Sequence, residues 1–485
     1  MVPSRAVFPD TGTDAKVAGA QLSSRRLALA CSLGAVLTSC ATLAPPHGPT
    51  PPWVAARTLE IGRAGAVLSG VAGDGATVFA ALTSTTDGPS PPPSPSLIRT
   101  PSPSPIRSPS PTTTIEAISS RDARASAPVW HTELDGRGGP LVVAAGRVIA
   151  ALGGAGSVAG FALRGEPGAA LVALDAATGA PAWTLAVDAT QWSVIAAVAP
   201  AADGVVVGGS FAGTLRIGNA VVSSAGKADG FVARISSTGG VAWLIRFGGP
   251  GIDAIQGVAA SPDRIAIAGT FTAGADLLGE PLEAVDDRSL YADGFVAELD
   301  LSGARQWAQS FGGKADESIA GVAIAASGRV VVAASARGSL HVSGEDLVAN
   351  GAADGLVAWW SSTGAAGGAV LLGGADFDGL RAIAAAGDRV VVAGFYSGSV
   401  ALGDRTLTAT GGDDAFVVAL DATGHVTEVW PISGDGREEI TAVAAIPGGF
   451  VAGVTHTAAA TVGTDALPAP RDPMAGAAIV ARPVH

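Results

Sequence analysis

The sequence is poor in cysteine, methionine, tyrosine and basic residues. Its 485 residues include two Cys, two Met and two Tyr, and 29 Lys and Arg stand against 42 Asp and Glu. Both cysteines fall within the first 40 residues, so cleavage before Cys40 would leave a mature chain with one Cys. If lipid occupies that sulfur, disulfides, thiol catalysis and cysteine-based metal sites are excluded together. The acidic balance argues against binding to nucleic acid and against adhesion of the surface to anionic lipid.

Helical patterns and catalytic signatures are also missing. No segment has a convincing helical apolar period over ten or more residues. There is no nucleophile elbow, phosphate-binding loop or dinucleotide fingerprint, and the Gly-rich strings are typical of loops between strands. The sequence therefore offers no catalytic constellation. Six histidines fall at unrelated positions, with none at metal-ligand spacing: His47, His131, His341, His425, His456 and His485.

The N-terminal residues belong to targeting rather than to the fold. Two consecutive arginines precede the apolar run Leu27–Ser39, and Cys40 follows. Such a run in a helix spans about 20 Å, less than the ~30 Å hydrocarbon core, so residues 1–39 are predicted to be a signal peptide. The tetrad LTSC (Leu37–Cys40) resembles the bacterial lipobox, whose Cys is acylated and becomes the new N-terminus. The alternative is an ordinary signal peptide that contains a Cys. Residues 40–52, with several prolines, predict a short tether.

A short apolar strand pattern recurs along the rest of the chain. Its seven copies are separated by 71, 57, 60, 65, 60 and 59 residues. A second pattern, Asp-Gly-Phe-Val-Ala with a Gly turn and usually a Trp, follows each copy. Each unit thus predicts about four short strands separated by Gly, Asp and Ser turns. The copies of the first pattern begin at Ala76, Arg147, Gly204, Arg264, Arg329, Arg389 and Gly448.

Repeated four-stranded units of this kind predict a ring. A sheet of small β-branched residues cannot cover both of its faces alone, so neighbouring copies stack on it, and a ring leaves few open strand edges. The sequence therefore predicts an all-β, seven-bladed β-propeller over residues 53–485. The aligned tryptophans are Trp130, Trp183, Trp243, Trp307 and Trp430, whereas the fifth repeat places Trp359 and Trp360 earlier in the pattern.

The two chain ends are expected to complete one blade between them. The last copy stops at Ala475–His485, where its Gly turn and Trp strand should follow. The missing part stands at the other end, because Trp53 precedes an apolar strand within Pro51–Gly73. We expect the strand around Trp53–Leu59 to complete the blade begun by residues 435–485. Such closure resists opening, since separated ends would expose unpaired strand groups. The alternative places Trp53 in a plain tether.

The repeats resemble a known family of bacterial propeller repeats. The segments GGDDAFVVALDATGHV (Gly411–Val426) and FGGPGID (Phe247–Asp253) resemble the SBBP repeat best. This likeness covers residues 200–440 well and the flanking copies more loosely. It implies a propeller on an exported or surface protein and does not imply one activity. The segment LVALDAATGAPAW (Leu171–Trp183) also resembles quinoprotein-type propellers and the propeller lipoprotein of outer-membrane barrel assembly. We interpret this likeness as a sequence pattern that propeller blades have in common.

A segment rich in Pro and Ser interrupts the first repeat at residues 85–112. Repeated Pro cannot join a sheet ladder, so the segment predicts an extended polyproline-type loop. It is expected between the second and third strands of its repeat, where a loop can protrude without disturbing the ring. Either the loop is simply disordered, or it is a projecting docking or wall-spanning segment.

Acidic residues recur in the loops that lead into the first strand of successive repeats. In a ring, such loops would meet around one mouth of the channel, where Asp253, Asp316, Asp376 and Asp435 would form a weak cation-binding ring, with Ca²⁺ as the candidate ion. The alternative is turn chemistry, in which Asp accepts backbone N–H bonds. We expect turn chemistry also for Asp229, Asp293, Asp354 and Asp414, which precede the Phe/Leu strands. Further loop carboxylates are Glu317, Asp378, Glu438 and Glu439.

These observations lead to two alternative expectations for the function. The first is a monomeric lipoprotein, attached to the outer membrane through lipid on Cys40, that binds another envelope protein or a glycan without catalysis or a cofactor. By resemblance, Ala41 lacks the Asp that commonly retains lipoproteins in the inner membrane. The alternative is a cofactor- or Ca²⁺-dependent propeller enzyme, quinoprotein-like or glycan-cleaving, with its site at the channel mouth.

Overall fold

The computed structural model describes residues 57–61, 66–74, 77–84, 111–119, 128–154, 157–158, 161–162, 168–272, 274–284, 292–470 and 476–484. The chain separates into two compact units, Met1–Thr50 and Pro51–His485, and every described residue belongs to the second. The predicted signal peptide, the tether with Cys40, and Trp53 lie outside the described residues.

The described chain is all-β, and its repeating unit is an antiparallel sheet of four strands. One such sheet has the order β12 (Trp192–Ala201), β13 (Gly204–Ala212), β16 (Asp229–Ser236) and β17 (Val241–Gly248). Almost all residues of β13 and β16 are buried, because sheets on both sides cover them. The Val- and Ala-rich runs GVVVGGSFA and DGFVARIS therefore form the two middle strands. No helix long and apolar enough to span a membrane occurs in this part of the chain.

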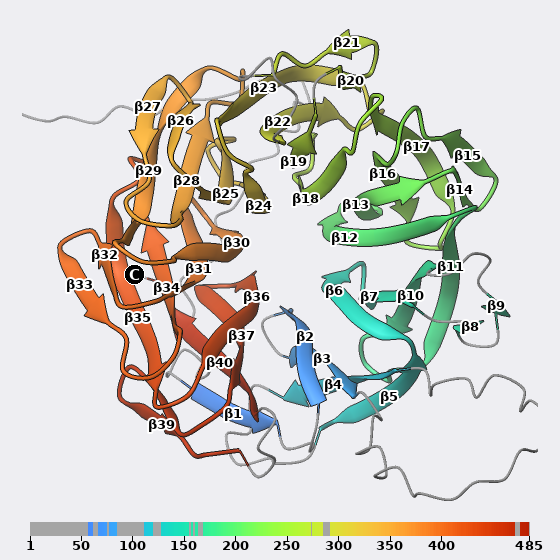
Figure 1. The fold of residues 1–485 in the computed structure, drawn as a ribbon. Helices are drawn as coiled ribbons and strands as arrows, with labels where there is room; N and C mark the ends of the chain where they lie inside the picture. Colours follow the sequence, from blue (N-terminus) through green and yellow to red (C-terminus); the bar gives the residue numbers. More distant parts are fainter. Residues whose placement is uncertain are drawn as a thin grey trace, which may run out of the picture. The chain divides into compact units, whose positions relative to one another are not determined.

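Sheets with this order surround a central channel as the blades of a β-propeller (Figure 1). The innermost strands are β2 (Ala66–Gly73), β6 (Arg137–Ala144), β12, β18 (Ala254–Ala260), β24 (Ser318–Ile324), β30 (Gly379–Ala386) and β36 (Glu438–Ile446). The second strands are β3 (Thr77–Ser84), β7 (Arg147–Gly153), β13, β19 (Arg264–Phe271), β25 (Val330–Ala336), β31 (Arg389–Tyr396) and β37 (Gly449–His456). The third strands are β4 (Thr112–Ser119), β10 (Ala169–Asp175), β16, β22 (Asp293–Asp300), β28 (Asp354–Trp360), β34 (Asp414–Leu420) and β40 (Gly476–Pro483). The fourth strands are β5 (Trp130–Asp135), β11 (Pro181–Ala189), β17, β23 (Arg305–Gly313), β29 (Ala366–Gly374), β35 (Val426–Gly434) and β1 (Arg57–Ile61).

One of these sheets joins the two ends of the described chain. Strand β1 pairs antiparallel with β40, with Arg57 opposite Ala481 and Ile61 opposite Ala477, and Figure 1 shows β1 beside β40. The expected closure is confirmed for Arg57–Ile61, which overlaps the predicted strand Trp53–Leu59 at residues 57–59. In each of the other blades the four strands follow one another in chain order, although strands that stand between the second and the third can pair elsewhere.

Five blades are extended outward by a two-stranded ribbon that comes from the following repeat. Strand β20 (Asp276–Leu277), for example, follows β19 in the chain but pairs with β17 of the preceding blade. These ribbons, which the repeat pattern does not predict, raise five sheets from four strands to six. A separate sheet of β8 (Ser157–Val158) and β9 (Phe161–Ala162) follows β7 at the corresponding place. The other ribbon strands are β14 (Thr214–Ile217), β15 (Ala220–Ser223), β21 (Glu280–Pro281), β26 (Ser339–Val342), β27 (Glu345–Val348), β32 (Ser399–Leu402), β33 (Arg405–Thr408), β38 (Ala460–Val462) and β39 (Asp465–Leu467).

The Pro/Ser-rich segment stands at the place in its repeat where the others carry a ribbon. Strands β3 and β4 pair directly on either side of it, with Ser84 opposite Thr112. The insertion therefore lies between the second and third strands of its repeat, as predicted, and leaves that sheet intact. Its residues 85–110 lie outside the described residues.

The recurring Trp links each blade to the next. The indole N–H of Trp183 donates to the carbonyl oxygen of Ser237 at 2.9 Å, in the turn between the third and fourth strands of the following blade. That turn passes over the indole through Gly239, whose φ of 84° favours glycine. A Cβ there would lie 3.0 Å from the ring. In the fifth repeat Trp359 takes this place from the third strand and packs against the turn at Gly424.

Candidate functional site

Each inner strand carries a β-bulge near its first residues. The pairing with the second strand shifts between Ile255 and Gly257 in β18, and between Leu380 and Ala382 in β30. A bulge leaves the extra residue unpaired and changes the direction of its side chain. In β6 the shift spans Gly138 to Leu141. The single bulge residues of the other strands line one end of the channel: Ser69, Ala196, Gln256, Ala320, Arg381 and Thr441.

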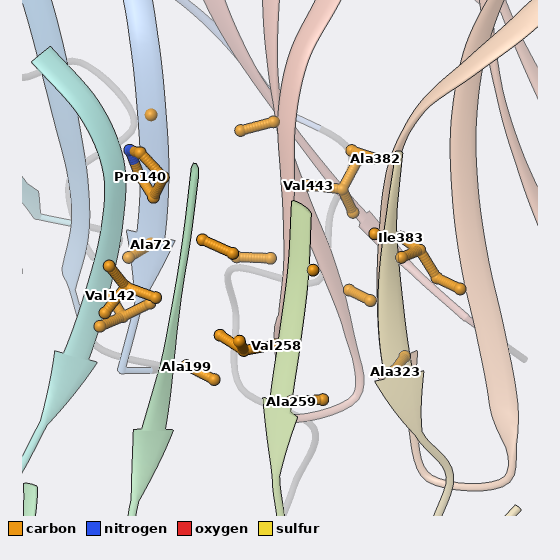
Figure 2. Close-up of a pocket in the computed structure, with 18 of the residues that line it drawn as sticks. Ala72, Pro140, Val142, Ala199, Val258, Ala259, Ala323, Ala382, Ile383 and Val443 are labelled. Carbon is orange, nitrogen blue, oxygen red and sulfur yellow. The ribbon is translucent and has the colours of Figure 1, made fainter. Parts of the chain in front are cut away.

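Beyond the bulges the channel wall is apolar. The lining of β18 continues through Gly257–Ala260, and the equivalent residues of the other inner strands are also small or aliphatic. Figure 2 shows Val142, Val258, Ile383 and Val443 among the residues that line this cavity, whose volume is about 620 Å³. Arg381 is the only ionisable side chain in the lining formed by the described residues. The channel is therefore an apolar cavity with one cation at one end.

Aromatic and basic side chains gather beside Arg381. Its guanidinium lies 4.6 Å from the centre of the Phe395 ring, and the rings of Phe395 and Phe377 are 5.3 Å apart. Arg337 lies 5.9 Å from the centre of the Phe377 ring. Phe377 is 42% exposed, and Ile252, at the equivalent position two blades earlier, is 57% exposed. We call this side of the ring, with Ile252, Phe377 and the bulge residues, the bulge face.

The four carboxylates predicted as a cation ring do not occupy equivalent positions. Asp253 is buried, and its carboxylate accepts hydrogen bonds from two backbone N–H groups at 2.7 and 2.8 Å. Asp316, Asp376 and Asp435 are all exposed, and Asp316 accepts one backbone N–H at 2.9 Å. Asp253 accepts from Gly249 and Thr272, and Asp316 accepts from Ala292. The bonds from Thr272 and Ala292 join separate loops and so differ from the local turn bonds given above as the alternative. Within the described ranges, no three His, Cys, Asp or Glu side chains are placed to hold a metal ion.

A different set of carboxylates repeats at four junctions between consecutive blades. The first residue of a third strand faces a carboxylate that stands at, or just before, the start of the next inner strand. At the first junction a Cβ on Gly248 would lie 2.7 Å from Asp253 Oδ2 and 3.0 Å from Asp229 Oδ1. All eight side chains are at most 4% exposed. The pairs are Asp229–Asp253, Asp293–Glu317, Asp354–Asp378 and Asp414–Glu438.

Burial makes ionisation of these carboxyl groups costly. Burial and the neighbouring Asp293 raise the pKa of Glu317 to about 8, and burial and Asp414 raise the pKa of Glu438 to about 8. Burial raises the pKa of Asp378 to about 6. At two of the four junctions the pKa of the glutamate therefore lies above 7.

The first junction differs because a guanidinium compensates its charge. Arg246 donates to Asp229 at 2.8 Å from the fourth strand. Strand register places uncharged residues at the corresponding sites of the other three junctions, so the described chain gives those junctions no equivalent cation. These uncharged residues are Ser310, Leu371 and Pro431.

The sequence holds a signal for these pairs that the prediction did not use. Each carboxylate before the inner strand stands four residues after a Gly that ends the preceding fourth strand or directly follows it. At two junctions that glycine N–H donates to the carboxylate, from Gly249 to Asp253 at 2.7 Å and from Gly374 to Asp378 at 2.6 Å. The constant spacing selects Glu317, Asp378 and Glu438 over the more exposed Asp316, Asp376 and Asp435.

Comparison with known proteins gives matches to solved structures alone. No family model and no curated protein matches the sequence. BamB from Moraxella catarrhalis is 14% identical, with 86% of this chain and 85% of that chain covered and a TM-score of 0.39. The quinohemoprotein alcohol dehydrogenase from Comamonas testosteroni is 11% identical, with 88% and 76% covered and a TM-score of 0.38.

A third solved structure with this likeness is a peptidase. The acylaminoacyl peptidase from Pyrococcus horikoshii is 10% identical, with 81% of this chain and 58% of that chain covered and a TM-score of 0.38. Because the three TM-scores stay below 0.5, nothing about the activities or partners of these proteins is transferred to this chain.

Proposed function

We propose that this chain is a lipid-anchored propeller of the bacterial cell envelope that binds another envelope protein through its bulge face and catalyses no reaction. In this proposal Cys40 carries the lipid that attaches the protein to the outer membrane, and the propeller acts as a monomer. No cofactor is needed, since the ring itself presents the binding surface.

The observation that carries the proposal is the exposed apolar and cationic cluster on the bulge face. Phe377 stands between Arg337 and Phe395, and Ile252 lies at the equivalent position of another blade. Aromatic residues and Arg are enriched in protein–protein interfaces and often dominate their binding energy. The chain is acidic, with a net charge of −13, and it has few exposed cations. Cations beside an aromatic surface therefore make that surface selective for a partner of complementary charge. A protein partner fits this mixture better than a glycan, which remains an outcome of the test.

Substituting Phe377 tests the partner surface. We expect Phe377→Ser, in acylated protein used to capture partners from detergent-solubilised envelopes, to reduce recovery of one specific protein by at least about tenfold, as for the loss of an interface hot spot. Val348→Ser is the matched control, because Val348 is 67% exposed on the ribbon strand β27. Undiminished capture by Phe377→Ser would contradict the proposal. Recovery of glycan instead of protein would replace the proposed partner class.

Substituting Cys40 tests the anchor separately. We expect Cys40→Ser to abolish incorporation of labelled palmitate and to move the protein from the membrane to the soluble fraction, because a membrane attachment through acyl chains needs the acceptor thiol. Fractionation of cells that express the wild-type chain or Cys31→Ser provides the control. A Cys40→Ser protein that stays in the membrane fraction would show that the attachment does not depend on lipid at this position.

A further inference from the structure

The channel differs from its surroundings in charge. It crosses a chain of net charge −13, yet its described lining contains no carboxylate and a single cation, Arg381. The bulge places Arg381 at one end of the lining, in the same ring as Gln256 and Thr441. The polar end of the cavity is therefore weakly cationic.

The rest of the lining is suited to an apolar chain. Up to four residues of each inner strand follow the bulge, which corresponds to roughly 13 Å along the strands. Val258, Ile383 and Val443 are aliphatic, and Ala199 and Ala323 are small, so the wall offers few polar partners to water (Figure 2). Apolar cavities with a few polar groups at one end are typical binding sites for small ligands.

The guanidinium of Arg381 has N–H groups that are available to donate hydrogen bonds to a ligand. Its Nε lies 3.7 Å from Glu439 Oε1, beyond hydrogen-bond distance, and its plane lies near the Phe395 ring. It donates no hydrogen bond to a described residue, although a guanidinium carries five N–H donors. Both Arg381 and Glu439 are partly exposed, at 44% and 39%. Gln256 Oε1, in the same ring, is buried and has no donor among the described residues.

We propose that the channel binds one long-chain aliphatic carboxylate, with its carboxylate on Arg381 and its alkyl chain along the apolar wall. Charge complementarity selects this ligand, because the single cation stands at one end of a wall that otherwise buries hydrocarbon. Arg pairs well with carboxylates through parallel N–H bonds, and each buried methylene adds favourable free energy. The Glu439 carboxylate competes with the ligand for the same guanidinium. Arg381 also belongs to the bulge face, but this binding needs neither a partner protein nor the lipid on Cys40.

Fluorescence titration of the purified protein with cis-parinaric acid and with its uncharged methyl ester tests the proposal. We expect saturable binding of one acid per chain. Arg381→Met should weaken binding of the acid by about tenfold and leave the ester unchanged, because it removes a charge-assisted contact. Glu439→Gln should strengthen binding of the acid by removing the competing carboxylate. Ala259→Trp should abolish binding of both probes by filling the channel.

Arg405→Met is the matched control, since Arg405 is exposed on the ribbon strand β33 and should bind both probes as the wild type does. Circular dichroism melting checks that each variant is folded. Binding that persists in folded Ala259→Trp, or an acid affinity that Arg381→Met does not change, would overturn the proposal. Absence of saturable binding to the wild-type chain would also overturn it.

Discussion

Deleting Arg57–Ile61 is expected to lower the midpoint of thermal unfolding by about 5 °C, because strand β1 closes the ring. Five residues of β1 pair with β40, and loss of their hydrogen bonds would cost roughly 1 kcal/mol each. The deletion also exposes the edge of β40 in a sheet that would keep three strands. The composite sheet should then open before the rest, which broadens the unfolding transition.

The control for this deletion has the same length. Removing the five residues Ser90–Ser94 from the Pro/Ser-rich segment should leave the midpoint unchanged, because β3 and β4 pair without that segment. Differential scanning calorimetry of both variants makes the comparison. If the two deletions gave the same midpoint as the wild type, β1 would add nothing to the stability of the ring.

Replacing Glu317 by Gln is expected to stabilise the protein at alkaline pH. Burial and Asp293 raise the pKa of Glu317 to about 8, whereas the unfolded chain has its ordinary value of 4.5. Below pH 4.5 both states hold the proton, so the group costs nothing. As the pH rises to about 8 the unfolded state ionises first, and the free energy of unfolding falls. Above about 8 the folded state holds the full cost of a buried charge.

The expected effect of Glu317→Gln is therefore large at pH 9 and small at pH 4. One pKa unit corresponds to about 1.4 kcal/mol, and after imperfect bonding of the amide we expect a gain on the order of 2 kcal/mol at pH 9. Urea unfolding at the two pH values measures it. Glu345→Gln, on the exposed ribbon strand β27, should show no such difference. A destabilised Glu317→Gln at pH 9, or an equal gain at both pH values, would mean that Glu317 is ionised in the fold at little cost.

The blade strands and the ring closure could be predicted from sequence because their causes are local and periodic. Runs such as RVVVAGFY at Arg389–Tyr396 are buried on both faces and so contain few polar residues. The Gly turn and Trp recur because each indole packs on a turn of the next blade, as Trp183 does on Gly239. The pairing of the two chain ends could be predicted because the last copy of the repeat lacks its final strand.

The ribbons and the candidate site were harder to predict from the sequence, and the reason is physical. Ribbon strands such as Ser399–Leu402 have four residues and alternate between buried and exposed, a pattern too short to separate from a loop. Bulges depend on pairing between strands, so neither Arg381 nor Gln256 stands out in the sequence as a channel residue. Among loop carboxylates, burial separates Glu317 from Asp316, and the four-residue spacing from the preceding Gly could have indicated this only once the packing of the junction was known.

The ribbons also determine what can be exchanged between copies of the repeat. Because β32 and β33 lie in the sixth repeat of the chain but extend the fifth sheet, the unit that is copied in sequence differs from the sheet seen in space. A duplicated or transplanted repeat would bring along the outer edge of its predecessor and would need the next repeat to cover its own. Chimeras of this protein should therefore be joined so that each fourth strand keeps the hairpin that follows it in the neighbouring copy.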